Sequence, residues 1–381
     1  MLQHLPSPWG EVLPVLPHLR LAAWEYALPC RVPLPVGRHL LINQRRGFLV
    51  RIASPDGRIG WGDVAPLPGL HAESLDHAWG QIMQAAEWMR AHGTDAQRLV
   101  SCLSSLAPSV RWGLDTALDD WRLAGESTAA WRDARVSING LFTLGADPKV
   151  AFDKIRSGCG TLKVKVGGRA AGMTWQTEVA ALKALRSEVG DGVRLRLDAN
   201  RAWSLSEAIQ FGRAVEGLGI EYIEEPLQVP SELERFYEGT GLGYAWDETL
   251  RERARAPVME AVPPRGLRAI ILKPALLNGM PALERSIRWA DRAGLQWIVT
   301  SCFESGVGLR NLARACWLHG SGSRAMGLGT SDYFSDDILE APGLVIDGGW
   351  MDLGKSFEAA VRMPPPGGWL PPDAVMGHGG G

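Results

Sequence analysis

Five short apolar runs in the middle of the chain carry charged residues at their carboxyl ends, and these runs decide the fold: TLKVKV (161–166), VRLRLD (193–198), IEYIE (220–224), GYAWD (243–247) and RAIILK (268–273). Each run has the length of a β-strand, and helical stretches separate the runs. Three more runs extend the series: RVSINGLF (135–142), QWIVT (296–300) and RAMGL (324–328). Because the runs begin about 25–30 residues apart, each forms one βα unit with the helix that follows it. The pattern predicts eight parallel strands.

A parallel series of this length closes either as a (β/α)-barrel or as an open doubly wound sheet. We favour the barrel because the strand count is eight and no glycine-rich phosphate-binding turn follows an early strand. The N-terminal part is different: residues 20–65 are rich in predicted β-strand, and helical stretches follow at 72–92 and 109–126. A chain of 381 residues is long enough for a large barrel with an accessory layer, or for two domains.

Composition and charge exclude several classes of protein. Apolar residues make up 46% of the chain and charged residues 22%, which is typical of a folded globular protein. The net charge is −2 and no basic run could follow a phosphate backbone, so we expect no nucleic-acid partner. No segment reaches the ~18 uninterrupted apolar residues of a membrane span, and the N-terminus lacks a signal-peptide pattern. The five cysteines lack CxxC spacing, which favours a reducing, cytoplasmic location.

Charged residues gather at one face of the predicted barrel. The carboxyl ends of parallel barrel strands all point to the same face, and that face carries the chemistry. The residues placed there are three carboxylates, Asp198, Glu224 and Asp247, and three lysines, Lys163, Lys165 and Lys273. Three oxygen ligands from successive strands suit a hard divalent cation, most simply Mg²⁺, with positions left for water and substrate.

Side-chain alternation sharpens this assignment. Lys163 and Lys165 are two positions apart, so they share one face of their strand. Of the neighbours Glu224 and Glu225 only one can point inward, and parity with Tyr222 selects Glu224. A lysine beside a metal ion has a lowered pKa, because like charge and desolvation disfavour its ammonium form. Such a lysine can act as a base near pH 7.

The distribution of histidine supports a lysine base. No histidine occurs between residues 93 and 318, so an acid or base in that stretch must be Lys, Asp, Glu, Tyr or Cys. Serine-hydrolase triads and histidine-rich metal sites are disfavoured for the same reason. The alternative interpretation is that the charged strand ends are solvated and form salt bridges. The occurrence of six such residues at the ends of adjacent βα units favours a functional site over this alternative.

Five longer motifs follow one another across the predicted barrel: KVKVG (163–167), LRLDANRAW (195–203), YIEEP (222–226), AWDETLRE (245–252) and ILKPALLNG (271–279). With TSCFESGVGLRNLA (300–313) and GWGDVAPLPGLHAES (60–74), they resemble the enolase superfamily in its muconate-lactonising branch. Within that branch the resemblance is greatest to the o-succinylbenzoate synthases of menaquinone biosynthesis, and it covers about residues 25–335. It implies an α/β fold, a (β/α)7β TIM-like barrel over residues 126–340. An α+β capping domain would comprise residues 1–125, with a C-terminal return and tail at 341–381.

The resemblance also implies roles for single residues. Mg²⁺, for which Mn²⁺ could substitute, would be held by Asp198, Glu224 and Asp247. Lys165 would be the general base, Lys163 its electrostatic partner, and Lys273 would face the opposite side of the substrate. Substrate contacts would fall on Arg196, Asn200, Thr300 and Gly327. The implied reaction is dehydration of 2-succinyl-6-hydroxy-2,4-cyclohexadiene-1-carboxylate to o-succinylbenzoate, so the expected partner is a small-molecule carboxylate.

Two other functions remain open at the level of sequence. A racemase or epimerase of N-acylamino acids or dipeptides could use the same site, with Lys165 and Lys273 exchanging a proton on opposite faces of the substrate. A non-catalytic barrel that serves as a binding scaffold would be expected to have lost some of the ligands, and none is lost. No feature of the sequence specifies an oligomeric state.

Overall fold

The structure is a computed structural model, and it describes residues 19–36, 40–92, 103–124, 131–168, 173–253 and 262–362. Its centre is a seven-stranded parallel sheet in which strand order follows chain order. The strands are β5 (Gly140–Thr143), β6 (Thr161–Lys165), β7 (Arg194–Asp198), β8 (Ile220–Glu224), β9 (Tyr244–Trp246), β10 (Leu267–Leu272) and β11 (Gln296–Val299). In a βα barrel, strands that are consecutive in the chain lie next to each other in the parallel sheet, and the spacing of the runs predicts this arrangement.

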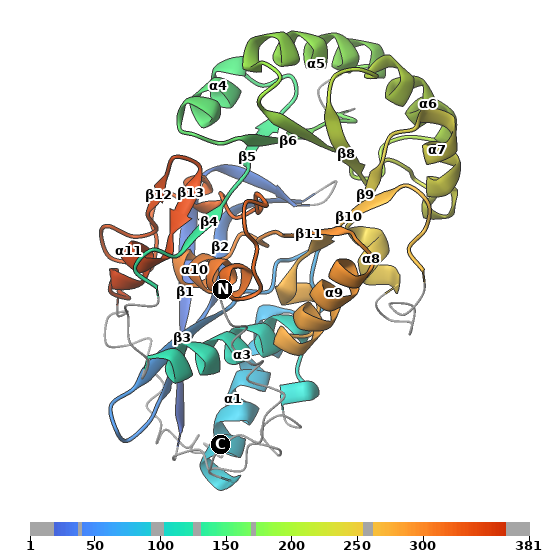
Figure 1. Ribbon diagram of the computed structural model, residues 1–381. Helices are drawn as coiled ribbons and strands as arrows, with labels where there is room; N and C mark the ends of the chain where they lie inside the picture. Colours follow the sequence, from blue (N-terminus) through green and yellow to red (C-terminus); the bar gives the residue numbers. More distant parts are fainter. Residues whose placement is uncertain are drawn as a thin grey trace.

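Helices follow the strands and cover the outer side of the curved sheet, as the arc of α4 to α7 outside β5 to β8 shows in Figure 1. They are α4 (Pro148–Arg156), α5 (Trp175–Val189), α6 (Leu205–Ala214), α7 (Leu233–Thr240), α8 (Glu248–Arg253), α9 (Met280–Arg292) and α10 (Gly306–Leu318). Short 3-10 turns precede two of them, at Pro230–Glu232 and Pro274–Leu276. Buried apolar side chains of the strands and helices form one large core, so the barrel is packed and its chemistry is confined to its rim.

The predicted eighth strand at 324–328 is wrong as a strand. Its place is taken by two isolated parallel bridges, Met326 with Ile138 and Gly327 with Thr300. These bridges still connect the two edges of the sheet and close the barrel. Gly327 lies close against Thr300, since an added Cβ would lie 2.6 Å from the Thr300 Cγ2 atom, and glycine is a poor strand former.

The predicted strand at 135–142 is divided in two. Its first part, β4 (Arg135–Ser137), leaves the barrel and pairs antiparallel with β13 (Trp350–Asp352), which also pairs with β12 (Ile346–Asp347). Only the second part, β5, belongs to the parallel sheet. Asn139 and Gly140 lie at the change of direction, and both residue types are disfavoured within strands. The C-terminal segment, ending in α11 (Leu353–Glu358), is thus attached to the start of the barrel.

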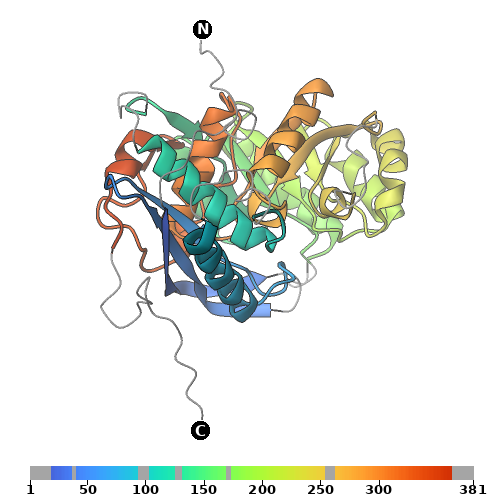
Figure 2. The same cartoon turned by 90° about the horizontal axis from the view of Figure 1, so that it is seen from below.

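The N-terminal part is a separate three-stranded antiparallel sheet in the order β1-β2-β3. The elements are β1 (Arg20–Val36), β2 (Leu40–Ala53), β3 (Ile59–Val64), α1 (Leu75–His92) and α3 (Pro108–Leu123). Both helices lie across one face of this sheet (Figure 2). Apolar side chains of the helices and the sheet form a second core. The arrangement is the α+β cap that the sequence predicts. In the part of the chain that the structure describes, no helix is long and apolar enough to cross a membrane.

Candidate active site

The register of the parallel sheet places three of the predicted residues side by side at the carboxyl ends of their strands. Lys165 of β6 pairs with Asp198 of β7, and Asp198 pairs with Glu224 of β8. Asp247 directly follows β9 and Lys273 directly follows β10. Strand geometry alone therefore brings residues from positions 165 to 273 to one edge of the barrel.

Each lysine forms an ion pair with at least one of the buried carboxylates. The Lys163 Nζ atom lies 2.7 Å from Glu224 Oε2 and 2.9 Å from Asp198 Oδ2. The Lys165 Nζ atom donates to Asp198 Oδ2 at 2.5 Å and to Asn200 Oδ1 at 2.8 Å. Lys273 donates to Asp247 Oδ2. The side chains of Lys163 and Lys273 are 13% and 16% exposed, whereas that of Lys165 is 35% exposed.

These contacts have strong effects on the pKa values of the carboxyl groups. Burial, reinforced by the charges of Asp198 and Asp247, raises the pKa of Glu224 to about 8. Burial acts to raise the pKa of Asp198 as well, but the ammonium groups of Lys163 and Lys165 hold it well below its usual range. Of these two carboxyl groups, Asp198 is therefore held in its charged form, whereas burial favours the neutral form of Glu224.

The pKa values of two lysines are also displaced. Burial acts to lower the pKa of Lys163 and of Lys273, but the facing carboxylates outweigh it and raise both. The opposite displacement was expected for a lysine beside a metal ion. The difference arises because the facing carboxylates favour the charged form of both ammonium groups.

Glu225 has a different role from its neighbour Glu224. Its backbone takes the left-handed conformation, with φ of 42°, and this turns the side chain away from the lysines. Its Oε1 atom accepts hydrogen bonds from the backbone N–H groups of Asp247 at 2.8 Å and Thr249 at 2.7 Å. Its Oε2 atom accepts from Arg201 Nε at 2.9 Å. Glu225 thus orients the loop that carries Asp247, whereas Glu224 is the one of the two that points toward the lysines.

A cavity of about 120 Å³ opens beside the lysines. Six of the predicted site residues line it: Lys163, Lys165, Asp198, Lys273, Thr300 and Gly327. Asn200, Glu224 and Asp247 belong to the same site through their contacts with the lysines. The Thr300 Oγ1 atom has no hydrogen-bond partner among the described residues, so it is available to a ligand.

Sequence reasoning missed six further residues that line the cavity: Asn139, Leu141, Ser301, Phe303, Gly329 and Thr330. They come from loops and from the short β5, whose side-chain directions no periodicity reveals. Ser301 and Phe303 lie in the motif at 300–313, directly after a predicted strand, and this position could have indicated that they are close to the site.

Arg196 lies away from this cavity. Its side chain is buried, its Nε donates to Glu221 Oε2 at 2.6 Å, and its Nη1 donates to the carbonyl of Ala325 at 2.6 Å. The guanidinium also stacks over the ring of Tyr222. In this structure Arg196 connects β7 with the chain segment that closes the barrel, and its role as a substrate contact stays a prediction.

Comparison with known protein families defines the class. A family model described as "Enolase C-terminal domain-like" matches residues 149–355, which span the barrel after β5 and the C-terminal return. A second model, described as "MenC, N-terminal domain", matches residues 19–121, which span the cap. The barrel with carboxylates and lysines at its rim, under an α+β cap, is therefore that of the enolase superfamily.

Similarity to curated proteins narrows this class. The o-succinylbenzoate synthase of Pasteurella multocida is 31% identical over 300 residues, covering 76% of this chain and 83% of that protein. The corresponding protein of Yersinia pseudotuberculosis is 33% identical over 315 residues, with 81% and 90% covered. Protein PHYLLO of Arabidopsis thaliana is 30% identical, but the chain spans 20% of its length. The chain belongs to the o-succinylbenzoate synthase family, whose members are hydro-lyases.

Solved structures agree on the fold. The L-Ala-D/L-Glu epimerase from Bacillus subtilis superimposes with a TM-score of 0.73 at 22% identity, covering 88% of this chain and 96% of that one. MenC from Desulfotalea psychrophila gives 0.69 at 23% identity, with 88% and 99% covered. A dipeptide epimerase from Enterococcus faecalis, complexed with Mg and a dipeptide, gives 0.74 at 20% identity, with 90% and 98% covered.

Proposed function

We propose that the protein dehydrates 2-succinyl-6-hydroxy-2,4-cyclohexadiene-1-carboxylate to o-succinylbenzoate in menaquinone biosynthesis. The observation that carries this proposal is the cavity in which Lys165 and Lys273 meet beside three buried carboxylates. Family membership supplies the substrate. Removal of a proton next to a carboxylate needs a base on one side and positive charge on the other, and the cavity offers both.

Asp198, Glu224 and Asp247 would hold Mg²⁺. In the part of the chain that the structure describes, no three such side chains are already gathered as a metal site, because lysine ammonium groups pair with them. Two observations nevertheless fit a cation: the pKa of Glu224 is raised to about 8 by burial and by the neighbouring carboxylates, and Asp247 Oδ1 has no hydrogen-bond partner among the described residues. Carboxylate oxygens are the ligands that Mg²⁺ prefers.

The chemistry supplied by a bound Mg²⁺ is electrostatic, since it stabilises negative charge that develops on the substrate carboxylate as the adjacent C–H bond breaks. Lys165 Nζ, in its neutral form, takes that proton. The same Nζ then returns the proton to the hydroxyl group on the same face of the ring, the C–O bond breaks and water leaves. Lys273 keeps its positive charge on the other face, because the carboxylate of Asp247 raises its pKa against the opposing effect of burial.

An epimerase of N-acylamino acids or dipeptides is the second candidate. The observation that favours it is that Lys165 and Lys273 both line the cavity, so one could remove a proton and the other could return it on the opposite face. In that reaction both lysines change protonation state, whereas dehydration needs a proton shuttle only at Lys165.

Incubation of the purified protein with each substrate tests the proposal. We expect formation of o-succinylbenzoate from the cyclohexadiene carboxylate, followed by its aromatic absorbance, at a kcat/KM far above that for epimerisation of N-succinylamino acids or dipeptides. Lys165→Ala, which removes the base, is the matched inactive control. Efficient epimerisation without any dehydration would replace the first candidate with the second.

A further inference from the structure

Phe303 has a strained backbone in the wall of the candidate active site. It lies in the loop between β11 and α10, lines the cavity that holds the lysines, and packs edge-on against Tyr333. Its φ is 60°, in the left-handed region that residues with a Cβ rarely adopt. Strain of this kind persists only where surrounding contacts impose it, and it is concentrated at functional sites.

Within the loop, the Phe303 N–H donates to Ser301 Oγ at 3.4 Å, and further contacts to both peptide units of Phe303 come from Arg45 in the cap. Arg45 Nε donates to the carbonyl oxygen of Phe303 at 3.0 Å, and Arg45 Nη2 donates to that of Cys302 at 3.4 Å. These two carbonyl groups belong to the peptide units on either side of the Phe303 Cα atom. Because one planar guanidinium donates to both carbonyl oxygens, it restrains the directions of both peptide units, and with them φ and ψ of Phe303.

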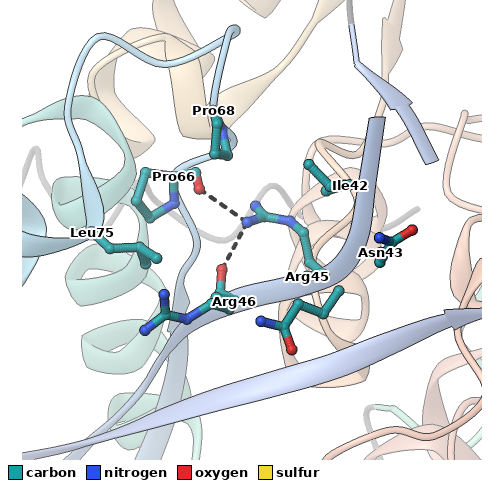
Figure 3. Close-up of a pocket in the computed structure, with 8 residues that line it drawn as sticks. Ile42, Asn43, Arg45, Arg46, Pro66, Pro68 and Leu75 are labelled. Carbon is teal, nitrogen blue, oxygen red and sulfur yellow. Dashed lines mark hydrogen bonds between the residues drawn. The ribbon is translucent and has the colours of Figure 1, made fainter. Parts of the chain in front are cut away.

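The same guanidinium is fixed in the cap by backbone alone. Its Nη1 atom donates to the carbonyls of Arg46 at 2.8 Å and Pro66 at 3.0 Å (Figure 3). Its Nη2 atom donates to the carbonyl of Ala65. Arg45 is 1% exposed, and the hydrogen bonds of its guanidinium go to backbone carbonyls. Transfer of a charged guanidinium from water into the protein costs free energy, and the hydrogen bonds of Arg45 must offset that cost.

We propose that Arg45 is a positioning residue for the dehydratase: it holds Phe303 in the left-handed conformation and thereby sets the ring as a wall of the substrate cavity. The inference rests on the proposed function for its catalytic consequence, but its structural part does not. Lysine cannot replace Arg45, because a single ammonium group cannot reach carbonyls of both the cap and the barrel loop in one plane.

The test combines substitutions at the two positions. The effect of Arg45→Met on the unfolding equilibrium constant is measured in the wild type, in Phe303→Ala and in Phe303→Gly. Phe303→Ala removes the ring but keeps the strain caused by a Cβ atom. Phe303→Gly removes both. For the unfolding equilibrium constant, we expect Arg45→Met to have about a tenfold smaller effect in Phe303→Gly than in Phe303→Ala, because glycine adopts this φ without help. Equal effects in the two backgrounds would overturn the structural part, whatever the protein catalyses.

The catalytic part has its own readout. Arg45→Met should raise KM for the cyclohexadiene carboxylate about tenfold with a smaller change in kcat, and the rise should vanish when Phe303→Ala has already removed the ring. Arg45→Lys should behave like Arg45→Met. Arg46→Met is the control, since the exposed Arg46 side chain pairs with Glu25 and its backbone carbonyl is unaffected.

Other outcomes are also decisive. If Arg45→Met fails to fold with Phe303 or Phe303→Ala but folds with Phe303→Gly, the proposal is supported. If it fails in all three backgrounds, or if KM rises equally with and without the ring, Arg45 holds something other than Phe303 and the proposal is overturned. A protein without dehydratase activity would leave the unfolding result unchanged, so failure of the proposed function is recognised separately.

Discussion

Lys165 and Lys273 approach one cavity from different strands, and their surroundings differ. Lys165 is the most exposed of the three lysines and has a second lysine, Lys163, two positions earlier on its strand. Lys273 is paired with the buried Asp247. A base must be accessible to the substrate, and the Lys165 side chain is 35% exposed whereas that of Lys273 is 16% exposed. A cation that only stabilises charge is favoured by facing carboxylates, which raise the pKa of Lys273 against the opposing effect of burial.

Exchange of the α-proton of a bound substrate analogue with D₂O separates these roles. We expect exchange on the Lys165 face to survive in Lys273→Arg, which keeps a cation. It should disappear in Lys165→Arg, because a guanidinium cannot act as a base near neutral pH. The measurement is deuterium incorporation followed by NMR. Loss of exchange in Lys273→Arg alone would show that the base has been assigned to the wrong strand.

At the scale of single residues, the alternation of side chains along a strand predicts which of them point toward the site. It placed Glu224 inward, and the structure has Glu224 against Lys163 while Glu225 turns to Asp247. The conformation of Phe303 could not be predicted in this way, because it depends on a hydrogen bond to Arg45 across 258 positions of sequence. Local periodicity carries no information about such a contact.

The elements of the barrel were predictable because each has a strong apolar pattern. The strand IEYIE has the predicted bounds, Ile220–Glu224. The prediction of a strand at 324–328 was wrong because pairing there is reduced to single bridges at Met326 and Gly327.

Contacts between the cap and the barrel cannot be predicted from such apolar patterns. The His71 ring is an example: its Nδ1 accepts from the Leu67 backbone at 2.9 Å, and its Nε2 lies 3.1 Å from the Ala275 carbonyl, two residues after Lys273.

The pH dependence of stability tests this contact. Burial lowers the pKa of His71 to about 4, although the charge of Glu73 opposes the effect. The unfolded chain, with a histidine pKa of about 6.5, therefore binds more protons between pH 4 and 6.5, so the contribution of His71 to stability falls as pH falls through this window. At pH 5 the loss amounts to about 2 kcal/mol relative to neutral pH.

His71→Asn keeps an acceptor for the Leu67 N–H but cannot titrate or reach Ala275. We expect this variant to be less stable than the wild type at pH 7, with the difference shrinking by about 2 kcal/mol at pH 5. Denaturant unfolding at the two pH values measures both quantities. His77→Asn, the same substitution at an exposed histidine, is the matched control. A difference that is constant with pH would exclude the neutral, buried state of His71.

At the scale of the whole molecule, the cap and the barrel form one functional unit. Asp63 of β3 accepts hydrogen bonds from the N–H and the hydroxyl of Ser305, each at 2.8 Å, at the start of α10. Asn311 of the same helix donates to the Trp61 carbonyl at 2.8 Å. The loop that precedes α10 contributes Thr300, Ser301 and Phe303 to the cavity, so the cap fixes one wall of a site whose charged groups all come from the barrel.

The central claim is that the carboxylates and lysines at the rim of the barrel form a metal-dependent dehydratase. The most direct test is the rate of o-succinylbenzoate formation by the metal-stripped protein in a chelator and after addition of Mg²⁺ or Mn²⁺. Three oxygen ligands, with no histidine in the central stretch, suit these hard cations. We predict that turnover is abolished in the chelator and restored by either ion. Full turnover by the metal-stripped protein in the chelator would contradict the account.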